Sequence, residues 1–497
     1  MLVLLPLVLL VLGSLAAFLL GQRPGLIRRL ALAAAGLSLL AAVAGIVSGP
    51  ASFSVPWLPG LGMAFTMRLD GLSMFLVALT ALATVAVVAF SSEQERPGGY
   101  YGLILLMAAT AIGTFLSTNL LLFYVFWELM IIPSYVLIGS YGEGAASRRA
   151  ALKFLVYSLV PSAFLLVAII ALAVAAQPAL GHLSFSLAAL ERVHLAASTQ
   201  NWIFVLFALS FMVKVPIWPL HAWMPDAYGE SRPQVAAMLS GVLSKTGLYA
   251  LIRFAFPLLP EAARLFAPAL AVIALASILY GAWVALGHKD GRMVIAYSSL
   301  SHLGLVFLAV VALNALGLDA AVLQMLNHGI YAVALFLLFG LVERSSGTRL
   351  LERLGGVARA APLFAGFFWI TVLAALGLPG LNGFSGEFLL LLAVFRTNQV
   401  WAWIAIAAAV FSAAYFIRLF QLTSQGPSAP PLKSKLVLRP VQLAVLLPMV
   451  ALMVYLGFQP GQVTSRVAPV AQSISRLEAR APGTSPVGNL SWEASRL

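Results

Sequence analysis

The stretch Leu239-Ser-Gly-Val-Leu-Ser-Lys245-Thr-Gly-Leu-Tyr249 lies in the middle of an apolar run over residues 233–255. A helix needs about 20 mostly apolar residues to cross the hydrocarbon core of a membrane, so this run is long enough for one crossing. Lys245 is the thirteenth of the 23 residues, which places an ionisable group near mid-depth. The run therefore predicts a membrane helix with a charge at a depth where lipid cannot solvate it.

The rest of the chain has the composition of a membrane protein. Of its 497 residues, 62% are hydrophobic and 9% are charged, and the mean hydropathy is +1.01. Soluble domains carry roughly 25% charged residues, so a soluble globular enzyme is excluded. The chain contains no cysteine, so it cannot bind an iron–sulfur cluster through thiolates or form a disulfide.

Apolar runs separated by charged, polar or Gly/Pro-rich breaks predict fourteen membrane helices. Their approximate ranges are 1–20, 26–48, 70–90, 99–117, 118–140, 150–176, 201–220, 233–255, 266–286, 291–313, 316–342, 363–394, 400–422 and 438–458. No segment sustains the alternation of apolar and polar residues that is typical of a membrane β-barrel. We therefore expect an all-α polytopic membrane protein, with residues 1–20 retained as its first span.

The distribution of Lys and Arg predicts the orientation of the helices. Eighteen of these residues lie in or beside the connections after odd-numbered helices, whereas the opposite connections hold five, including Arg253. Basic connections stay in the cytoplasm, so both chain ends should lie on the outer, periplasmic side of a bacterial inner membrane. The same bias, together with contact to anionic lipid, explains the net charge of +13 without nucleic-acid binding.

Four ionisable residues lie well inside apolar runs, namely Glu128, Lys214, Lys245 and Glu387. Each costs about 2.5–3.5 kcal/mol to insert, so such side chains normally face a partner or a polar cavity. A structural ion pair between two helices would explain one Lys and one Glu. Two of each near mid-depth favour a polar path across the bundle instead, and this is our main hypothesis.

Two histidines lie near the middle of consecutive predicted helices. His302 follows Tyr297-Ser-Ser-Leu-Ser, and His328 stands in the stretch Asn327-His-Gly-Ile-Tyr331. Either one alone is consistent with packing in the core. Together they suit a proton relay, because imidazole exchanges protons near neutral pH. A metal site is not predicted, since the chain has neither cysteine nor a His-Glu-x-x-His motif.

Helix-breaking residues stand beside two of the charges. Lys214-Val-Pro-Ile-Trp-Pro219 interrupts the seventh predicted helix, and Gly377-Leu-Pro-Gly-Leu-Asn-Gly-Phe-Ser-Gly-Glu387 interrupts the twelfth. Broken helices next to intramembrane charges, five helices apart, indicate a repeated transporter unit. Helices 4–8 and 9–13 would be the two units. Because five is an odd number, successive units would cross the membrane in opposite directions, and the repeat would be inverted.

This reading divides the chain into four parts. Residues 1–98 hold helices 1–3, residues 99–255 the first repeat, residues 256–425 the second repeat, and residues 426–497 helix 14 and a polar tail. All four intramembrane charges and both central histidines fall in the two repeats.

Five separated blocks resemble the antiporter-like subunits of respiratory complex I, in the same order, within residues 65–425. They are Leu122-Phe-Tyr-Val-Phe-Trp-Glu128-Leu-Met-Ile-Ile-Pro133, Lys214-Val-Pro-Ile-Trp-Pro-Leu-His221-Ala-Trp-Met-Pro225-Asp226-Ala, Leu239-Ser-Gly-Val-Leu-Ser-Lys245-Thr-Gly-Leu-Tyr249, Ala296-Tyr-Ser-Ser-Leu-Ser-His302 and Gly377-Leu-Pro-Gly-Leu-Asn-Gly-Phe-Ser-Gly-Glu387-Phe. Within this family the chain is most similar to the subunit M (chain 13) branch of the bacterial proton-pumping NADH:quinone oxidoreductases. That branch has a glutamate on its broken twelfth helix, where Glu387 stands.

The resemblance implies a proton-translocating membrane subunit that carries no redox centre itself. It implies that Glu128 and Lys214 form a pair near one half-channel and that Lys245 is the central proton carrier. It further implies that His302 and His328 connect Lys245 through water to Glu387, on the side of the second half-channel.

The resemblance also implies partners. NADH, flavin, iron–sulfur clusters and quinone are expected in other subunits, and homologous antiporter-like subunits are expected on either side of this chain in the membrane arm. The alternatives are a homologous subunit of a membrane-bound hydrogenase or of a multisubunit cation/proton antiporter, and a structural subunit that transports nothing. Two positions depart from the family pattern: Tyr228 stands where the family usually has histidine, and Arg232 lies in a stretch that is usually neutral.

Overall fold

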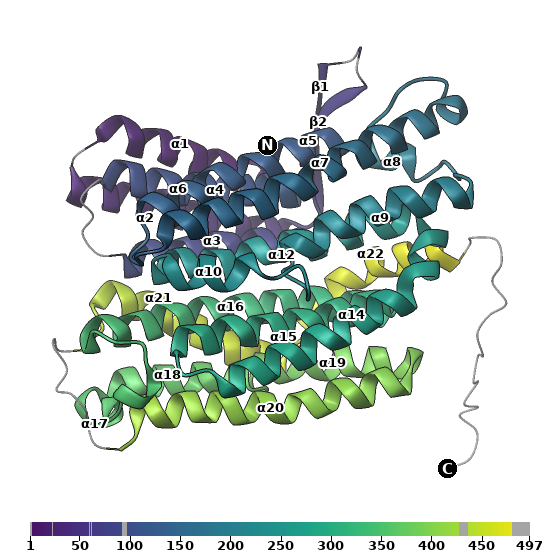
Figure 1. Ribbon diagram of the computed structural model, residues 1–497. Helices are drawn as coiled ribbons and strands as arrows, with labels where there is room; N and C mark the ends of the chain where they lie inside the picture. The colour runs from purple at the N-terminus through teal and green to yellow at the C-terminus, as the bar shows by residue number, and fades with distance from the viewer. Residues whose placement is uncertain are drawn as a thin grey trace.

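In the computed structural model of this chain, the helices lie side by side and run roughly parallel to one another (Figure 1). The structure describes residues 2–21, 23–58, 60, 62–91, 97–426 and 436–479. Within these ranges, eleven helices have the length and apolar composition needed to cross a membrane, and two further apolar helices are shorter. The predicted helical membrane fold is confirmed.

The first four long helices pack on one another. After a short 3₁₀ turn at Leu2–Leu4 they are α1 Leu5–Leu20, α2 Pro24–Ser48, α3 Met74–Phe90 and α4 Pro97–Leu116. The hydroxyl of Ser14 in α1 donates a hydrogen bond to the carbonyl of Gly102 in α4, at 2.8 Å. A Cβ at Gly98 would lie 2.7 Å from the carbonyl oxygen of Ala17, so only glycine allows this approach. Small residues and an interhelical hydrogen bond thus hold α1 against α4, as is usual between membrane helices.

The next helices are interrupted beside two of the ionisable residues. The fifth predicted helix divides at Met130, just after Glu128, and the seventh ends at Lys214 and resumes at Trp223, so the predicted break at Pro216 is confirmed. The elements are α5 Leu120–Leu129, α6 Ile131–Ser140, α7 Ser147–Leu180, α8 Leu187–Leu190, α9 Ala197–Lys214 and α10 Trp223–Glu230.

The helix that carries Lys245 changes its winding twice. It consists of α11 Pro233–Met238, a π-helix Leu239–Leu243, α12 Ser244–Ala250, a second π-helix Leu251–Ala255 and α13 Phe256–Leu258. π-Helical turns are rare and frequently mark functional sites. The apolar part of this helix is entirely buried by the rest of the protein, so the helix lies at the centre of the bundle.

The following helices include the second predicted break. They are α14 Pro260–Gly287, α15 Gly291–Val311, α16 Ala315–Ser346, the short turns Leu351–Arg353 and α17 Val357–Ala360, α18 Pro362–Ala375, α19 Asn382–Thr397 and α20 Gln399–Ser424. The interruption between α18 and α19 contains Pro379, as predicted. Gly377 and Gly380 have φ angles of +78° and +94° there, which only glycine adopts without strain.

Two features were missed by the sequence analysis. Strands β1 Ala51–Leu58 and β2 Met63–Leu69 form an antiparallel hairpin that projects beyond the helices (Figure 1). After α21 Pro440–Phe458, part of the predicted polar tail forms the helix α22 Gly461–Ala479. Its buried residues, at helical spacing, are Val463, Val467, Ala471 and Ile474. Neither segment has the long apolar run from which the helices were predicted.

Two arginines counted as connection residues are in fact buried. Arg253 lies inside the helix that carries Lys245, with 4% of its surface exposed, and Arg292 in the first turn of α15 is equally enclosed. Both are paired with a carboxylate, at 2.5 Å, which makes a buried guanidinium tolerable. The number of crossings, the inverted relation of the repeats and the four-part division of the chain stay predictions.

Candidate functional site

Lys245 and His328 form a direct contact at the centre of the bundle. Lys245 is fully buried, and its Nζ lies 2.6 Å from Nδ1 of His328, which comes from α16. Nζ also donates to the backbone carbonyl of Ser240, five residues earlier, at 2.5 Å. Ser240 belongs to the π-helix, so the irregular turn helps to hold the ammonium.

Contact with an ammonium determines the tautomer of His328. Lysine can only donate, so Nδ1 must accept and a neutral imidazole carries its proton on Nε2. Nε2 is buried and has no hydrogen-bond partner among the described residues. His328 therefore presents a free N–H on the side away from Lys245.

His302 and Glu387 form a second contact. Nδ1 of His302, in α15, lies 2.8 Å from Oε1 of Glu387, in α19. Nε2 of His302 lies 3.3 Å from the hydroxyl of Tyr415, in α20. The ring centroids of His302 and His328 are 6.0 Å apart, which is the spacing of neighbouring packed rings, so the two contacts lie next to each other.

Two neutral residues of α16 complete this group. Tyr331 lies beside both imidazoles, with ring centroids 5.2 Å from His328 and 6.0 Å from His302. Nε2 of Gln324 lies 3.5 Å from Oε1 of Glu387 and 3.4 Å from the Tyr331 hydroxyl. Neither residue was predicted from the sequence as part of the site. Their spacing from His328, four residues before and three after, was a usable signal, because such residues share one face of a helix.

A small cavity adjoins the second contact. Its volume is about 20 Å³, and His302, Glu387 and Ser412 are among its lining residues. A polar cavity above roughly 10–15 Å³ can hold one water molecule. The cavity beside the carboxylate of Glu387 is therefore large enough for one water molecule.

Glu128 and Lys214, expected as a pair near one half-channel, lie close enough for the charge of each to act on the other. Among the described residues, neither Oε1 of Glu128 nor Nζ of Lys214 has a hydrogen-bond partner, and no ion pair joins them. Nζ of Lys214 instead lies 5.2 Å from the ring centroid of Trp127 and 5.8 Å from that of Phe154. Aromatic faces attract a cation, so the indole next to Glu128 and the ring of Phe154 hold the ammonium in addition to the more distant carboxylate.

The break after Lys214 packs closely against the helix of Lys245. A Cβ at Gly247 would lie 2.6 Å from the carbonyl oxygen of Phe211 and 2.6 Å from a methyl group of Val215. Glycine at this position brings the end of α9 against α12. The two lysines thus occupy adjoining helices, although none of the described polar contacts connects them.

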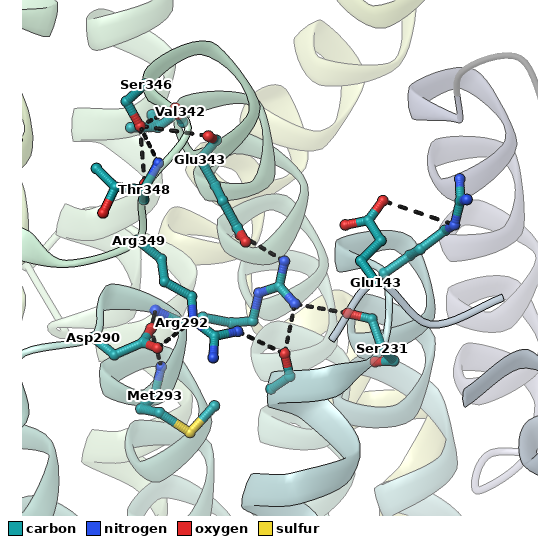
Figure 2. A network of polar contacts seen from close by, with 12 residues as sticks. Glu143, Ser231, Asp290, Arg292, Met293, Val342, Glu343, Ser346, Thr348 and Arg349 are labelled. Carbon is teal, nitrogen blue, oxygen red and sulfur yellow. Dashed lines mark hydrogen bonds and ion pairs between the residues drawn. The ribbon is translucent and has the colours of Figure 1, made fainter. Parts of the chain in front are cut away.

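A polar network fixes the loop at the end of broken helix α10 (Figure 2). The guanidinium of Arg292 donates to the carbonyls of Gly229 and Ser231, at 2.9 and 2.7 Å, and to Oε2 of Glu343 at 2.5 Å. Arg349 pairs with Asp290 at 2.6 Å in the same network. Glu343 is among the lining residues of two cavities, of about 250 and 370 Å³. Both cavities are large enough to hold water beside this network.

The two departures from the family pattern have structural counterparts. Nε of Arg232 donates to the carbonyl of Tyr141 at 2.8 Å and lies 3.8 Å from a carboxylate oxygen of Glu143. Tyr228 is fully buried, with its ring edge-on to Trp223 and Phe336. Arg232 therefore ties two loops together, and Tyr228 acts in packing.

Known proteins match this chain over most of its length. Residues 117–412 match the family described as NADH:quinone oxidoreductase/Mrp antiporter, TM. NADH-quinone oxidoreductase subunit M of Mycobacterium tuberculosis is 33% identical over 84% of this chain and 82% of its own length. NAD(P)H-quinone oxidoreductase chain 4 2 of Thermosynechococcus vestitus is 34% identical, over 85% of this chain and 80% of its own.

Solved structures give the same result. A chain of respiratory complex I from Thermus thermophilus superposes with a TM-score of 0.88 and 33% identity, covering 96% of this chain and all of that one. The Mrp complex from Dietzia sp. has a chain with a TM-score of 0.82 at 24% identity, which shows a shared fold. The chain described here therefore belongs to the NADH:quinone oxidoreductase/Mrp antiporter family of membrane proteins and is a homologue of complex I subunit M.

Proposed function

We propose that this chain moves protons across a bacterial inner membrane as a subunit of an NADH:quinone oxidoreductase, through Lys245, His328, His302 and Glu387. The observation that supports this most is the facing arrangement of two contacts, Lys245–His328 at 2.6 Å and His302–Glu387 at 2.8 Å. Each contact joins a proton donor to an acceptor, and both are enclosed by the bundle. A purely structural subunit has no use for four such groups in one line.

The first transfer is local. A proton on Nζ of Lys245 passes to Nδ1 of His328, and the proton already on Nε2 leaves toward His302. The ring is then left with its proton on Nδ1, and it returns to the first tautomer, by rotation or by exchange with water, before the next transfer. One water molecule beside the two rings, whose centroids are 6.0 Å apart, completes the transfer to His302. Imidazole suits this step because both nitrogens can gain or lose a proton.

The second transfer ends at a carboxylate. His302 passes a proton to Glu387 over the 2.8 Å contact, and Gln324 and Tyr415 hold the two groups in place. The cavity beside Glu387 supplies the water that takes the proton onward. Both chain ends lie on the periplasmic side in this proposal, so the basic loops face the cytoplasm.

Lys214 and Glu128 control the relay through charge rather than contact. In a low-dielectric interior, two ammonium groups on adjoining helices repel each other strongly, so a proton on Lys214 disfavours one on Lys245. Glu128 opposes this effect by stabilising the charge of Lys214. A change in the position of either group would therefore change the proton occupancy of Lys245.

The redox chemistry belongs to partner subunits. The chain has no cysteine for an iron–sulfur cluster, and no group of three His, Cys, Asp or Glu residues in the described part of the chain is placed to hold a metal ion. We place NADH, flavin, the clusters and quinone in other subunits, and homologous antiporter-like subunits beside this chain.

The test is proton pumping by the whole complex in proteoliposomes, with Lys245→Ala in this chain. We expect quinone-linked NADH oxidation to continue and proton uptake into the vesicles to fall. Normal proton pumping in an intact Lys245→Ala complex would overturn the proposal. A sodium gradient that persists in parallel would assign the chain to cation/proton exchange.

A further inference from the structure

Arg253 is buried in the membrane helix of Lys245 but takes no part in the proposed relay. Its Nη2 lies 2.5 Å from Oδ1 of Asp70, and its Nε donates to the Tyr249 hydroxyl at 3.0 Å. Both members of the ion pair are enclosed, with 4% and 2% of their surfaces exposed. A buried pair is costly unless its hydrogen bonds are complete, so the position of Arg253 needs an explanation.

Arg253 lies on the way from Lys245 to one surface. Lys245, Tyr249 and Arg253 follow one another at intervals of four residues toward the helix end at Leu258. Beyond that end is a cavity of about 600 Å³, whose lining includes Glu191, Pro257 and Leu258. The bias of basic residues predicts that this end faces outward.

The charge of Arg253 acts on that cavity. Burial raises the pKa of Glu191, whereas Arg253 and Arg68 lower it. The electrostatic influence of Arg253 therefore extends to a carboxyl group in the lining of the outer cavity. Arg253 lies between that cavity and Lys245.

The groups around Arg253 cannot pass a proton inward. An arginine side chain carries only donors and keeps its charge in proteins. The Tyr249 hydroxyl accepts from Arg253 and donates its one proton to the carbonyl of Phe115 at 2.7 Å, so that proton points away from the route to Lys245 and is held by a backbone acceptor. A fixed positive charge in a narrow polar route also repels protons, as an arginine does in water channels.

Asp70 holds the guanidinium in this position. Its Oδ1 also accepts from the backbone N–H groups of Leu72 and Ser73, at 3.1 and 3.3 Å. The turn that carries Asp70 is covered by α22, because a Cβ at Gly71 would lie 2.1 Å from the carbonyl oxygen of Arg466. The turn that holds the ion pair is therefore packed closely against α22.

We propose that Arg253, held by Asp70 and Tyr249, is an electrostatic plug that prevents protons in the outer cavity from reaching Lys245. It is a specificity-determining residue: it makes the route through His328 and Glu387 the one open path to the outer side. The inference rests on the proposed function of Lys245 as a proton carrier. Without such a plug, a pumped proton could return to Lys245 directly.

The test measures passive proton leak into proteoliposomes that contain the whole complex, after an acid pulse and without NADH. The variant Asp70→Asn with Arg253→Gln removes both charges and leaves no stranded carboxylate. We expect its leak to rise several-fold and to return to the parental level when Lys245→Ala is added. Arg68→Gln is the matched control: its side chain is 56% exposed and 3.6 Å from Asp70, and we expect no leak.

The outcomes separate the plug from the relay. If the double variant leaks no more than the parent, the proposed plug is wrong. If Lys245→Ala nevertheless stops pumping in the same complex, the proposed relay still stands. A leak that persists with Lys245→Ala also overturns the plug, because the protons would then pass elsewhere. Arg253→Lys, which keeps the charge, should remain tight even if the double variant fails to assemble. A leaky Arg253→Lys complex would show that packing, not charge, closes the route.

Discussion

Nδ1 of His328 lies 2.6 Å from Nζ of Lys245, whereas the buried Nε2 of the same ring has no hydrogen-bond partner within the part of the chain that the structure describes. The ring centroid of His328 is 6.0 Å from that of His302. Only Nδ1 of the two His328 nitrogens thus has a hydrogen-bond partner among the described residues. His328 thus accepts from Lys245 through one nitrogen and offers an N–H on the other, and in the proposed relay it is the one ring that joins Lys245 to His302.

His328→Gln should therefore stop proton pumping. A glutamine amide can accept from Lys245 but cannot take a proton on one atom and release one from another. We expect pumping to fall by about 100-fold or more, the usual contribution of a positioned proton-transfer group, with normal assembly on native gels. Tyr331→Phe, which keeps the neighbouring ring and removes a hydroxyl, is the control and should retain most of the pumping.

Glu387→Gln separates charge from packing on the broken twelfth helix. Glutamine preserves the size of the side chain and its contacts with His302 and Gln324, but it cannot accept a proton. Pumping should fail while the complex remains assembled and NADH oxidation continues. Ser412→Ala, in the lining of the same cavity, should pump normally. If Glu387→Gln also pumps normally, the carboxylate is only a cap on the helix.

Lys214→Ala should reduce proton pumping while the complex still assembles. Its ammonium makes aromatic contacts with Trp127 and Phe154, and removing it leaves Glu128 without the buried cation whose charge acts on it. Pumping should drop sharply, whereas Lys214→Arg, which keeps the cation over the rings, should preserve part of it. Pumping assays at matched assembly levels will show whether the charge matters.

The predicted orientation can be tested at the two ends of α7. A reporter inserted at Ala145, next to Gly144, should report the cytoplasm, and one at Gly181 the periplasm. Gly144 itself is a poor site, because a Cβ there would lie 1.8 Å from a carboxylate oxygen of Glu230. Two reporters on one side would remove a crossing and contradict the inverted repeats.

The connection before α15 should be sensitive to acid. Burial lowers the pKa of His288, Arg349 and Arg418 add to this, and Asp290 opposes it. The neutral Nδ1 accepts from the backbone N–H of Asp290 at 3.1 Å. The unfolded chain binds this proton more readily, so the stabilisation is present above a pH of about 6.5 and is lost below it.

Hydrogen exchange measures this effect. Protection of the first turn of α15, corrected for the intrinsic rate, should decrease as the pH falls below about 6.5. His288→Gln has no proton to gain, so its protection should change less over the same range. Equal profiles for the two chains would mean that His288 does not control this turn.

The sequence was sufficient for the ionisable residues and not for their pairing. Glu128, Lys214, Lys245 and Glu387 stand out because a charge in an apolar run is conspicuous. Their partners depend on the rotation of each helix about its axis, which a run of apolar residues does not specify. Lys245 therefore contacts His328 directly, whereas Lys214 lies against the indole next to Glu128.

Other residues were missed for different physical reasons. Gln324 and Tyr415 are neutral, so they do not disturb an apolar run enough to be noticed. Arg253 is the third residue from the end of its predicted span, 233–255, where a basic residue is ordinarily a connection residue. Its burial and its contact with Asp70 appear only in the structure. The β1–β2 hairpin depends on pairing between strands and not on apolar length.

The π-helix before Lys245 supplies one of the acceptors of its ammonium. In a π-helix each carbonyl faces the residue five positions later instead of four, and the carbonyl of Ser240, five residues before Lys245, accepts from Nζ at 2.5 Å. Deletion of a single residue within Leu239–Leu243 would restore ordinary winding and leave the hydropathy of the span almost unchanged. The lysine would still be in the membrane, yet its ammonium would lose the carbonyl that this spacing provides. The winding of one turn thus sets how well a buried cation is solvated by its own helix.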